Sequence, residues 1–311
     1  MMRSNLKYIL LILTAGLLYV PCTWPEQYIS PQCQALEEIQ DYQSKPVKYG
    51  TGILWKISGK ERIPSYLFGT IHVADQRILD LPEQVTRALG ETDLFVMEAL
   101  PELEQAAMFS DMMFFRDGNR LDKLITAPIF EKTVEIMKQY MIPEQVVAIM
   151  KPWAAYVTMN YPPQSGAVLD LELMARASLN GKDIKGLESM AEQGEIFNKL
   201  PVSTQVRLLT DTVCHYDTVV DDIEEMKEFY LNQDTGGLYN YTNRYSIKDD
   251  AIYMDLMNNL LTRRNHTMAD RMQDILNKGN AFIAIGALHL PGDEGVLNLL
   301  NKRGYYISKV Y

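Results

Sequence analysis

Two short turns of similar composition lie near opposite ends of the chain, and each one ends in a histidine. Gly69-Thr70-Ile71-His72 closes one apolar run, and Gly286-Ala287-Leu288-His289 closes another that begins at Asn280. The sequence holds four histidines, so half of them share one local setting. Ligands of open α/β sheets bind at the carboxyl ends of the strands. We therefore expect His72 and His289 to project from strand ends into a shared site, with each glycine allowing a tight turn.

A carboxylate completes a set of groups that could activate water. Glu98 ends the apolar run Leu94–Met97, so it is expected at the same carboxyl edge of the sheet. Two imidazoles and a carboxylate are common ligands of divalent metal ions, and they equally suit a histidine base that a carboxylate orients. The residues alone leave both kinds of chemistry open. The competing interpretation is structural: satisfied core or loop histidines, and a surface glutamate at a strand end.

Further polar residues could join this set. Glu188 follows Ile184 and Leu187 as Glu98 follows its own apolar run, which makes it a second candidate carboxylate. Arg264 and Asn265 lie within a helical stretch. An arginine that faces the site could hold a carboxylate or a developing oxyanion, whereas the alternative is a solvated helix residue.

The remaining histidines and nearby acids have weaker claims on the site. His266 is expected on a different helix face and therefore exposed, and His215 has no partner pattern that suggests a role. Asp75, Asp293 and Glu294 lie close to the two turns. We interpret these three as helix caps first and as ligands second.

Apolar runs and helical patterns alternate along the chain and place these residues. Strands are expected at 52–57, 65–71, 93–98, 182–188, 280–286 and 304–310. Helices are expected from 81, over 101–157, over 169–178, over 190–276 with a break at 234–237, and over 294–301. This order predicts an α/β fold with a mixed, mostly parallel central sheet and flanking helices. It also predicts a large helical insert over approximately 101–280, interrupted by the strand near 182–188, that could form a lid.

The first 22 residues carry a targeting pattern. Arg3 and Lys7 precede the uncharged apolar run 8–20, whose length suits a signal peptide better than a full transmembrane helix. The cleavage region is poor, so a retained membrane anchor is the alternative. Residues 23–48 are polar and Gln-rich, and we expect them to link this segment to one domain over 49–311. The protein is thus expected to be exported: periplasmic, secreted or anchored to the membrane.

The three cysteines bear on the same question. Cys22 and Cys33 could pair in an oxidising compartment if both survive processing, which would leave Cys214 alone. If cleavage removes Cys22, no obvious pair remains. The chain has no Cys-x-x-Cys motif, so a thiolate zinc site is not expected.

Composition excludes some classes of function. The 311 residues are 47% hydrophobic, enough to bury a full core, and carry a formal net charge of −10. Proteins that bind nucleic acids broadly need clustered lysine and arginine, so no DNA or RNA partner is expected. The sequence also lacks a Gly-x-Ser-x-Gly elbow, a His-Glu-x-x-His motif and a P-loop. The oligomeric state is left open.

Taken in order, a set of short motifs resembles the TraB/GumN family, which includes the TIKI-type proteases and is related to the ChaN and erythromycin esterase folds. The resemblance extends from about Gly52 to Val310. The motifs are Leu54-Trp55-Lys56-Ile57, Phe68-Gly69-Thr70-Ile71-His72, Val96-Met97-Glu98, Lys151-Pro152-Trp153, Gly186-Leu187-Glu188-Ser189, Arg264-Asn265-His266-Thr267-Met268 and Gly286-Ala287-Leu288-His289-Leu290-Pro291-Gly292.

The resemblance implies a fold of two pseudo-two-fold halves, with both histidine turns facing one centre. It implies metal-dependent peptide cleavage, with manganese or cobalt as the expected ion and zinc as an alternative. The metal and catalytic set of the family corresponds to His72, Glu98 and His289. We therefore expect a metal-dependent hydrolase, specifically a peptidase, that acts on a peptide or a small ester or amide.

The resemblance also gives roles to the other polar residues and leaves rival functions open. Arg264 and Asn265 match the polar pair of the family, and Glu188 matches its Gly-Leu-Glu motif; all three are expected in the catalytic site. The esterase relatives suggest a metal-free hydrolase with a histidine base oriented by Glu98. Other relatives suggest a non-enzymatic protein that binds haem or a peptide.

Overall fold

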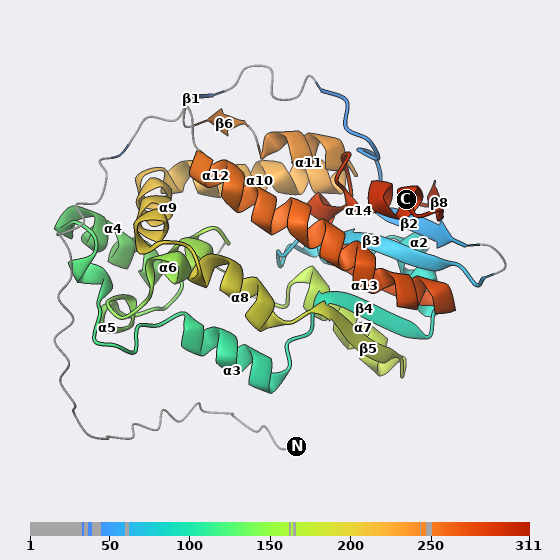
Figure 1. The fold of residues 1–311 in the computed structure, drawn as a ribbon, viewed down its shortest axis with the longest axis horizontal. Coiled ribbons are helices and arrows are strands. Elements are labelled where there is room, and N and C mark those ends of the chain that lie inside the picture. The colour runs from blue at the N-terminus through green and yellow to red at the C-terminus, as the bar shows by residue number, and fades with distance from the viewer. Residues whose placement is uncertain are drawn as a thin grey trace.

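The computed structural model describes residues 33, 37–38, 45–59, 62–161, 163, 166–242, 244–246 and 251–311. The expected leader at 1–22 lies outside these residues, as does most of the expected linker at 23–48. A β-sheet occupies one end of the molecule and a body of helices the other (Figure 1). In the part of the chain that is described, no helix combines the length and the apolar character needed to cross a bilayer.

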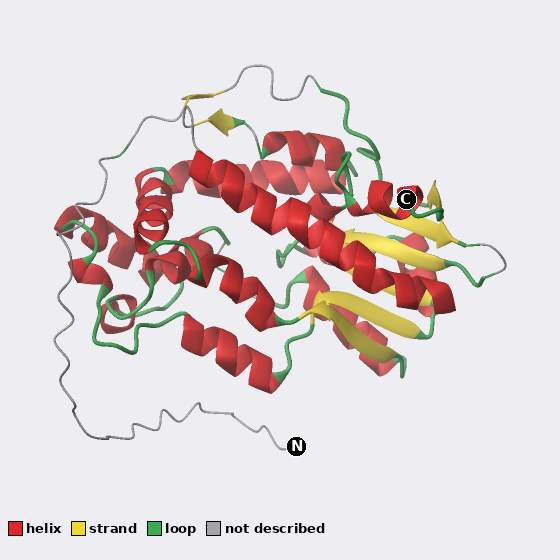
Figure 2. Cartoon of the chain, viewed as in Figure 1, coloured by secondary structure: helices red, strands yellow, loops and turns green. Residues whose placement is uncertain are grey.

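The described strands form one large sheet and one short pair. In spatial order the large sheet contains β5 (Asp183–Glu188), β4 (Leu94–Ala99), β7 (Ala281–Gly286), β3 (Ser65–Thr70), β2 (Leu54–Ser58) and β8 (Tyr306–Lys309). Strands β5, β4, β7 and β3 are parallel, whereas β2 pairs antiparallel with both β3 and β8. The short pair joins β1 (Glu37–Glu38) and β6 (Tyr245–Ser246). The predicted α/β fold with a mixed, mostly parallel sheet is confirmed (Figure 2).

The two strands that lead into the histidine turns are neighbours at the centre of the sheet. Strands β3 and β7 pair in parallel, with Gly69 opposite Ile285 and Thr70 opposite Gly286. Residues 281–285 of β7 are all buried, as expected for a parallel strand covered on both faces. The two turns therefore leave the sheet side by side, although more than two hundred residues separate them in the sequence.

Two apolar cores cover the two faces of this sheet. On one face, Phe68, Phe95 and Phe282 pack under α1 (Gln76–Leu79), α2 (Glu83–Gly90) and α7 (Leu169–Leu179). On the other, Val96 and Ile283 pack under α13 (Arg264–Lys278) and α14 (Val296–Lys302). Adjacent residues in a strand point to opposite faces, so Phe95-Val96 and Phe282-Ile283 serve both cores.

A third core holds the helical body together. This core includes the buried side chains of Trp153, Met150 and Leu209. The Trp153 ring stacks on Phe197, with the ring centroids 5.8 Å apart. The helices of this body are α3 (Leu103–Met112), η1 (Leu121–Lys123), α4 (Ala127–Lys138), α5 (Glu144–Val147), α6 (Pro152–Met159), α8 (Met190–Asn198) and α9 (Val202–Cys214). These elements lie between β4 and β7 in sequence, where the sequence predicts the helical insert.

A long continuous helix links the body to the sheet. It consists of α12 (Ala251–Met257), the π-helix η2 (Asn258–Arg263) and α13, and it crosses the sheet in Figure 1. The expected break at 234–237 is displaced: α10 (Tyr216–Leu231) ends earlier, and α11 (Thr235–Tyr241) begins within it. The reason is a helix cap: the Asp234 side chain accepts a hydrogen bond from the Gly237 N–H, and α11 begins at the next residue.

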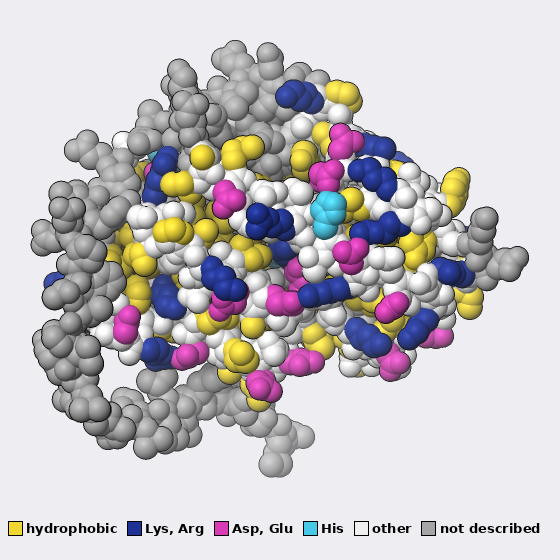
Figure 3. Space-filling model, in the orientation of Figure 1, with side chains coloured by type: hydrophobic (Ala, Val, Ile, Leu, Met, Phe, Trp, Pro, Cys, Tyr) yellow, Lys and Arg dark blue, Asp and Glu magenta, His cyan; other side chains and the backbone are white. Residues whose placement is uncertain are grey.

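Acidic and basic side chains intermingle over the face of the molecule shown in Figure 3.

The disulfide differs from the expected pair. Cys33 bonds to Cys214 at the end of α9, with their Cα atoms 5.7 Å apart, so the suggested pairing with Cys22 is wrong. The partners are 181 residues apart, and their meeting depends on the path of the folded chain. A cross-link over a loop of this length removes about 5 kcal/mol of conformational entropy from the unfolded chain in the chain-entropy model.

We predict that Cys214→Ser lowers the free energy of unfolding by about 2–5 kcal/mol, because the unfolded chain regains that entropy. Urea denaturation of the oxidised proteins measures the difference. Cys22→Ser is the control and is expected to leave the midpoint unchanged. A cross-linked peptide containing Cys22 and Cys33 in a non-reducing digest would contradict the assignment.

Candidate active site

Packing leaves little room for a side chain at the glycine of the first histidine turn. A Cβ atom on Gly69 would lie 3.1 Å from Ala287 Cα, in the second turn, and 2.6 Å from Cδ1 of Leu290, directly after it. A Cβ atom on Gly286 would lie 3.4 Å from the carboxylate of Glu98. Neither glycine has a positive φ, so neither adopts the left-handed backbone conformation that favours glycine. Gly69 instead lets the second turn approach the end of β3 closely, whereas a Cβ atom on Gly286 would meet Glu98 only at ordinary contact distance.

His289 is buried and has a defined orientation. It lies in η3 (Ala287–His289), directly after β7, and is 4% exposed. The Asn265 Nδ2 group donates to the carbonyl oxygen of Glu294 at 2.8 Å, so Asn265 Oδ1 faces the ring and accepts from His289 Nδ1 at 2.6 Å. The proton of the neutral ring therefore lies on Nδ1, and Nε2 carries a lone pair. That Nε2 lies 3.8 Å from Glu98 Oε2.

His72 is oriented in a parallel way by a residue that the sequence did not single out. Its Nδ1 lies 2.8 Å from Oδ2 of Asp170, at the start of α7. Thr70 donates to the other oxygen of the same carboxylate at 2.7 Å. The His72 side chain is 38% exposed, so this ring lies nearer to the surface than His289 does. The ring of Tyr161 lies beside it, with centroids 6.1 Å apart.

Glu98 lies at the carboxyl end of β4, in the same region, and is held from several directions. Its Oε2 accepts from the N–H of Gly286 at 2.9 Å, and its Oε1 accepts from Gln193 Nε2 at 3.0 Å. Arg264 Nη2 also donates to Oε1. Glu98 is 8% exposed, so the interpretation as a surface glutamate does not apply.

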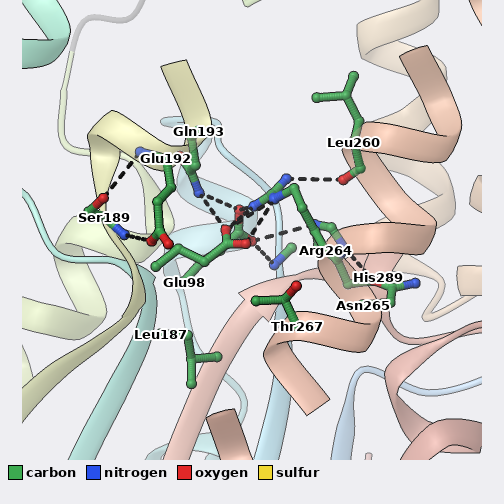
Figure 4. A network of polar contacts seen from close by, with 12 residues as sticks. Glu98, Leu187, Ser189, Glu192, Gln193, Leu260, Arg264, Asn265, Thr267 and His289 are labelled. Atoms are coloured by element: carbon green, nitrogen blue, oxygen red, sulfur yellow. Dashed lines mark hydrogen bonds and ion pairs between the residues drawn. The ribbon is translucent and has the colours of Figure 1, made fainter. Parts of the chain in front are cut away.

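Arg264 joins two buried carboxylates (Figure 4). Besides contacting Glu98, it donates from Nη2 to Glu188 Oε2 at 2.8 Å and from Nε to the same oxygen at 3.0 Å. Gln193 donates to both glutamates, with 3.3 Å to Glu188. One guanidinium thus neutralises one of two negative charges, and a charged group at this depth needs such partners. The alternative of a solvated arginine does not apply, because its side chain is 13% exposed.

The environments of the two histidines move their pKa values in opposite directions. Burial opposes the charged form of His72, but the hydrogen bond to Asp170 and its negative charge outweigh that effect and raise the pKa of His72 to about 9. Burial lowers the pKa of His289 to about 4, against the attraction of Glu98. Burial alone would raise the pKa of Glu98, yet His289 and Arg264 hold it well below its usual range.

The structure brings together most of the residues expected from the sequence. His72, Glu98 and His289 influence one another electrostatically, and Arg264 and Asn265 contact members of that group. Glu188 also belongs to it, through its contacts with Arg264 and Gln193. His266 is exposed as expected, and it pairs with Glu294 at 2.7 Å.

Three further residues of the site were missed. Asp170 is in the first turn of a helix, where an acid is explained by the helix dipole, and nothing local distinguishes it. Gln193 is one of many glutamines. Tyr161 precedes a proline-containing segment that reads as a loop. None of them has a sequence signal beyond its residue type, because each reaches the site through tertiary packing.

The expected divalent ion suits these donors in chemistry. Both imidazoles have Nδ1 held by an oxygen acceptor, Asp170 Oδ2 or Asn265 Oδ1, which is how metal-binding histidines are usually oriented. Metal binding by either ring would then use Nε2, and Glu98 would add a carboxylate. As the side chains stand, no three His, Cys, Asp or Glu residues within the described residues are grouped closely enough to hold an ion. The set of His72, Glu98 and His289 as metal ligands stays a prediction.

Comparisons with known proteins agree on one family. The sequence model of the TraB/PrgY/gumN family matches residues 53–309. Metalloprotease TIKI2 of Danio rerio is 24% identical over 85% of this chain and 62% of its own length. Metalloprotease TIKI1 of Xenopus tropicalis is 22% identical over 81% and 60%, and metalloprotease TIKI1 of Homo sapiens is 24% identical over 82% and 61%. The chain thus spans about three fifths of the length of these relatives. No solved structure matches it significantly.

We predict that Arg264→Met lowers the free energy of unfolding by about 3–5 kcal/mol, because it leaves Glu98 and Glu188 buried without their counter-charge. Adding Glu188→Gln removes one of those charges and is expected to restore part of the loss. Urea denaturation of the single and double variants measures both effects.

The control for this cycle is Arg271→Met, on the same helix. Arg271 pairs with the exposed Glu192 and donates to the Leu187 carbonyl oxygen at 2.7 Å. A surface pair contributes about 0–1 kcal/mol and a hydrogen bond about 1 kcal/mol, so its loss is expected to cost about 1–2 kcal/mol. If Arg264→Met lowered the free energy of unfolding no more than Arg271→Met does, the ion pairs of Arg264 with Glu98 and Glu188 would not stabilise the fold as proposed.

Proposed function

The chain belongs to the TraB/PrgY/gumN family, and from that premise we propose that it is a metal-dependent hydrolase that cleaves peptide bonds where the two histidine turns meet. The relatives named metalloproteases support this class of reaction. Their names also favour a metal cofactor. Because the chain covers about three fifths of their length, the reaction, the substrate and the partners are all part of the proposal.

One observation carries the proposal: two histidines and a glutamate lie at or just beyond the carboxyl ends of three adjacent parallel strands. His72 follows β3, His289 follows β7 and Glu98 ends β4, in the order in which those strands lie in the sheet. The imidazole of His289 and the carboxylate of Glu98 approach to 3.8 Å. A buried base and a buried carboxylate in such proximity, at the carboxyl edge of a sheet, form a site for chemistry on a bound ligand.

His72, His289 and Glu98 are the residues that would hold a divalent ion, and we propose manganese or cobalt, with zinc as the alternative. Such an ion supplies a water molecule of lowered pKa and polarises the scissile carbonyl group. The protein positions the donors. The contacts of Gln193 and Arg264 with Oε1 leave Oε2 of Glu98 directed toward His289.

In this proposal, Arg264 and Asn265 do not hold the ion but position the residues that do. Asn265 holds the His289 ring with Nε2 toward the site, through the hydrogen bond to Nδ1. Arg264 forms ion pairs with both Glu98 and Glu188 and so supplies the counter-charge beside the site. Glu188 thereby becomes part of the support of the site, because its carboxylate is already shared between Arg264 and Gln193.

A metal-free hydrolase is the second candidate, and the opposite pKa shifts of the two histidines favour it. With a pKa of about 9, His72 is an imidazolium at neutral pH and can donate a proton to a leaving group. With a pKa of about 4, His289 is neutral there and can accept a proton from water. Two groups whose pKa values are driven apart are suited to serve as acid and base.

We also propose that the protein functions outside the reducing cytoplasm. The bond between Cys33 and Cys214 requires an oxidising compartment, and the apolar run at 8–20 supplies a signal or an anchor for export. An exported hydrolase with an acidic surface would act on a peptide or on a small ester or amide, and no nucleic-acid partner is proposed.

We predict that the purified protein cleaves peptides with the help of a divalent ion, and that chelation abolishes the activity. His72→Ala and His289→Ala should each lower kcat/KM by about 100-fold or more, because each removes a ligand or a proton-transfer group. A peptide library read by mass spectrometry, before and after chelation and readdition of Mn²⁺ or Co²⁺, gives the measurement.

His266→Ala is the matched control, because His266 is exposed and pairs with Glu294 outside the group of three. It should keep the wild-type rate. Full activity after complete removal of metal would favour the metal-free candidate, and activity that persists in the His72→Ala/His289→Ala double variant would exclude both.

A further inference from the structure

We propose that Asp170 is the positioning residue of His72, fixing the ring so that Nε2 is the nitrogen presented to a bound ion. The inference rests on the proposed function and adds to it a residue outside every motif of the two histidine turns. Asp170 comes from helix α7, about a hundred residues after the histidine that it contacts.

The geometry commits both oxygens of the Asp170 carboxylate. Oδ2 lies 2.8 Å from His72 Nδ1, and Oδ1 accepts from the Thr70 hydroxyl at 2.7 Å. An ionised carboxylate only accepts hydrogen bonds, so Nδ1 must carry a proton and donate it. With Nδ1 committed to Asp170, Nε2 is the nitrogen that gives up its proton when an ion binds, and its lone pair is then available to that ion.

Thr70, at the end of β3, is the second group that the Asp170 carboxylate binds. Thr70 is the last residue of β3, and His72 follows it in a turn that the Val73 N–H closes on the Ile71 carbonyl oxygen at 2.9 Å. Both side chains reach the Asp170 carboxylate from there. One carboxylate can therefore hold both. Asp170 is 6% exposed, and its burial is compensated by these two partners.

The contacts distinguish this role from that of an ordinary acid at the start of a helix. The N-cap of α7 is Val168, which makes no side-chain cap hydrogen bond, and the Asp170 oxygens bond to the strand end. His289 provides a comparison within the same site, because Asn265 Oδ1 accepts from its Nδ1. Each ring thus has an oxygen acceptor on Nδ1, charged for His72 and neutral for His289. A charged acceptor makes the imidazole a stronger donor to a metal ion.

The test is the affinity of the full-length protein, stripped of metal, for Mn²⁺ or Co²⁺ alone, measured by isothermal titration calorimetry. Loss of such a supporting residue typically weakens metal binding about 10–100-fold, so we expect this effect for Asp170→Ala. Asp170→Asn keeps the size and one acceptor oxygen but loses the charge, and it is expected to bind about 10-fold more weakly than wild type. Thermal unfolding without metal monitors the fold of each variant.

Glu172→Ala is the matched control, since Glu172 is on the same helix and pairs with Arg176 away from the site. It should bind the ion as the wild type does. A purely structural role would lower the unfolding temperature of the Asp170 variants while leaving their ion affinity unchanged.

Two outcomes distinguish a failure of the positioning role of Asp170 from a failure of the metal-dependent function. If the wild type binds the ion and both Asp170 variants bind within twofold of it, the positioning role is overturned while the metal site stands. Asp170→Asn decides alone should Asp170→Ala not fold. If the wild type binds no divalent ion, the metal-dependent function is overturned and this inference with it.

Discussion

The parallel alignment of four strands is the constraint on which the site depends. Strands β5, β4, β7 and β3 run in one direction, so their carboxyl ends form one edge. Side chains that follow these strands must meet there, however far apart they lie in sequence. His72, His289 and Glu98 meet at this edge, and the lack of a side chain on Gly69 lets Ala287 and Leu290 pack against the end of β3.

Buried charge is the second constraint, and it explains why the site includes residues from the helices. Glu98 and Glu188 end neighbouring strands, so two carboxylates are forced together in a region that excludes water. Arg264 on the long helix supplies the counter-charge to both. The next residue, Asn265, binds His289, so one helix turn supports a carboxylate and an imidazole together.

The elements of the fold could largely be predicted because each has a local cause. The apolar runs of β4 and β7 indicated strands, and the fold class followed from the order of strands and helices. The break near Asp234 was misplaced, because one cap hydrogen bond decides where α11 begins. The pairing of Cys33 also could not be predicted, since any two cysteines become partners only when the folded chain brings them together.

The sequence by itself determined the candidate chemistry: two histidines and a glutamate, each placed by the apolar strand before it. Strand ends are local features that a sequence pattern indicates, and the types of the residues at those ends limit which reactions are possible there. Tertiary structure alone decided the environment of each group. Asp170 raises the pKa of His72 and burial lowers that of His289, although both histidines follow similar turns. Those differences arise because long-range packing sets which charges and how much water surround a side chain, and no local pattern encodes that.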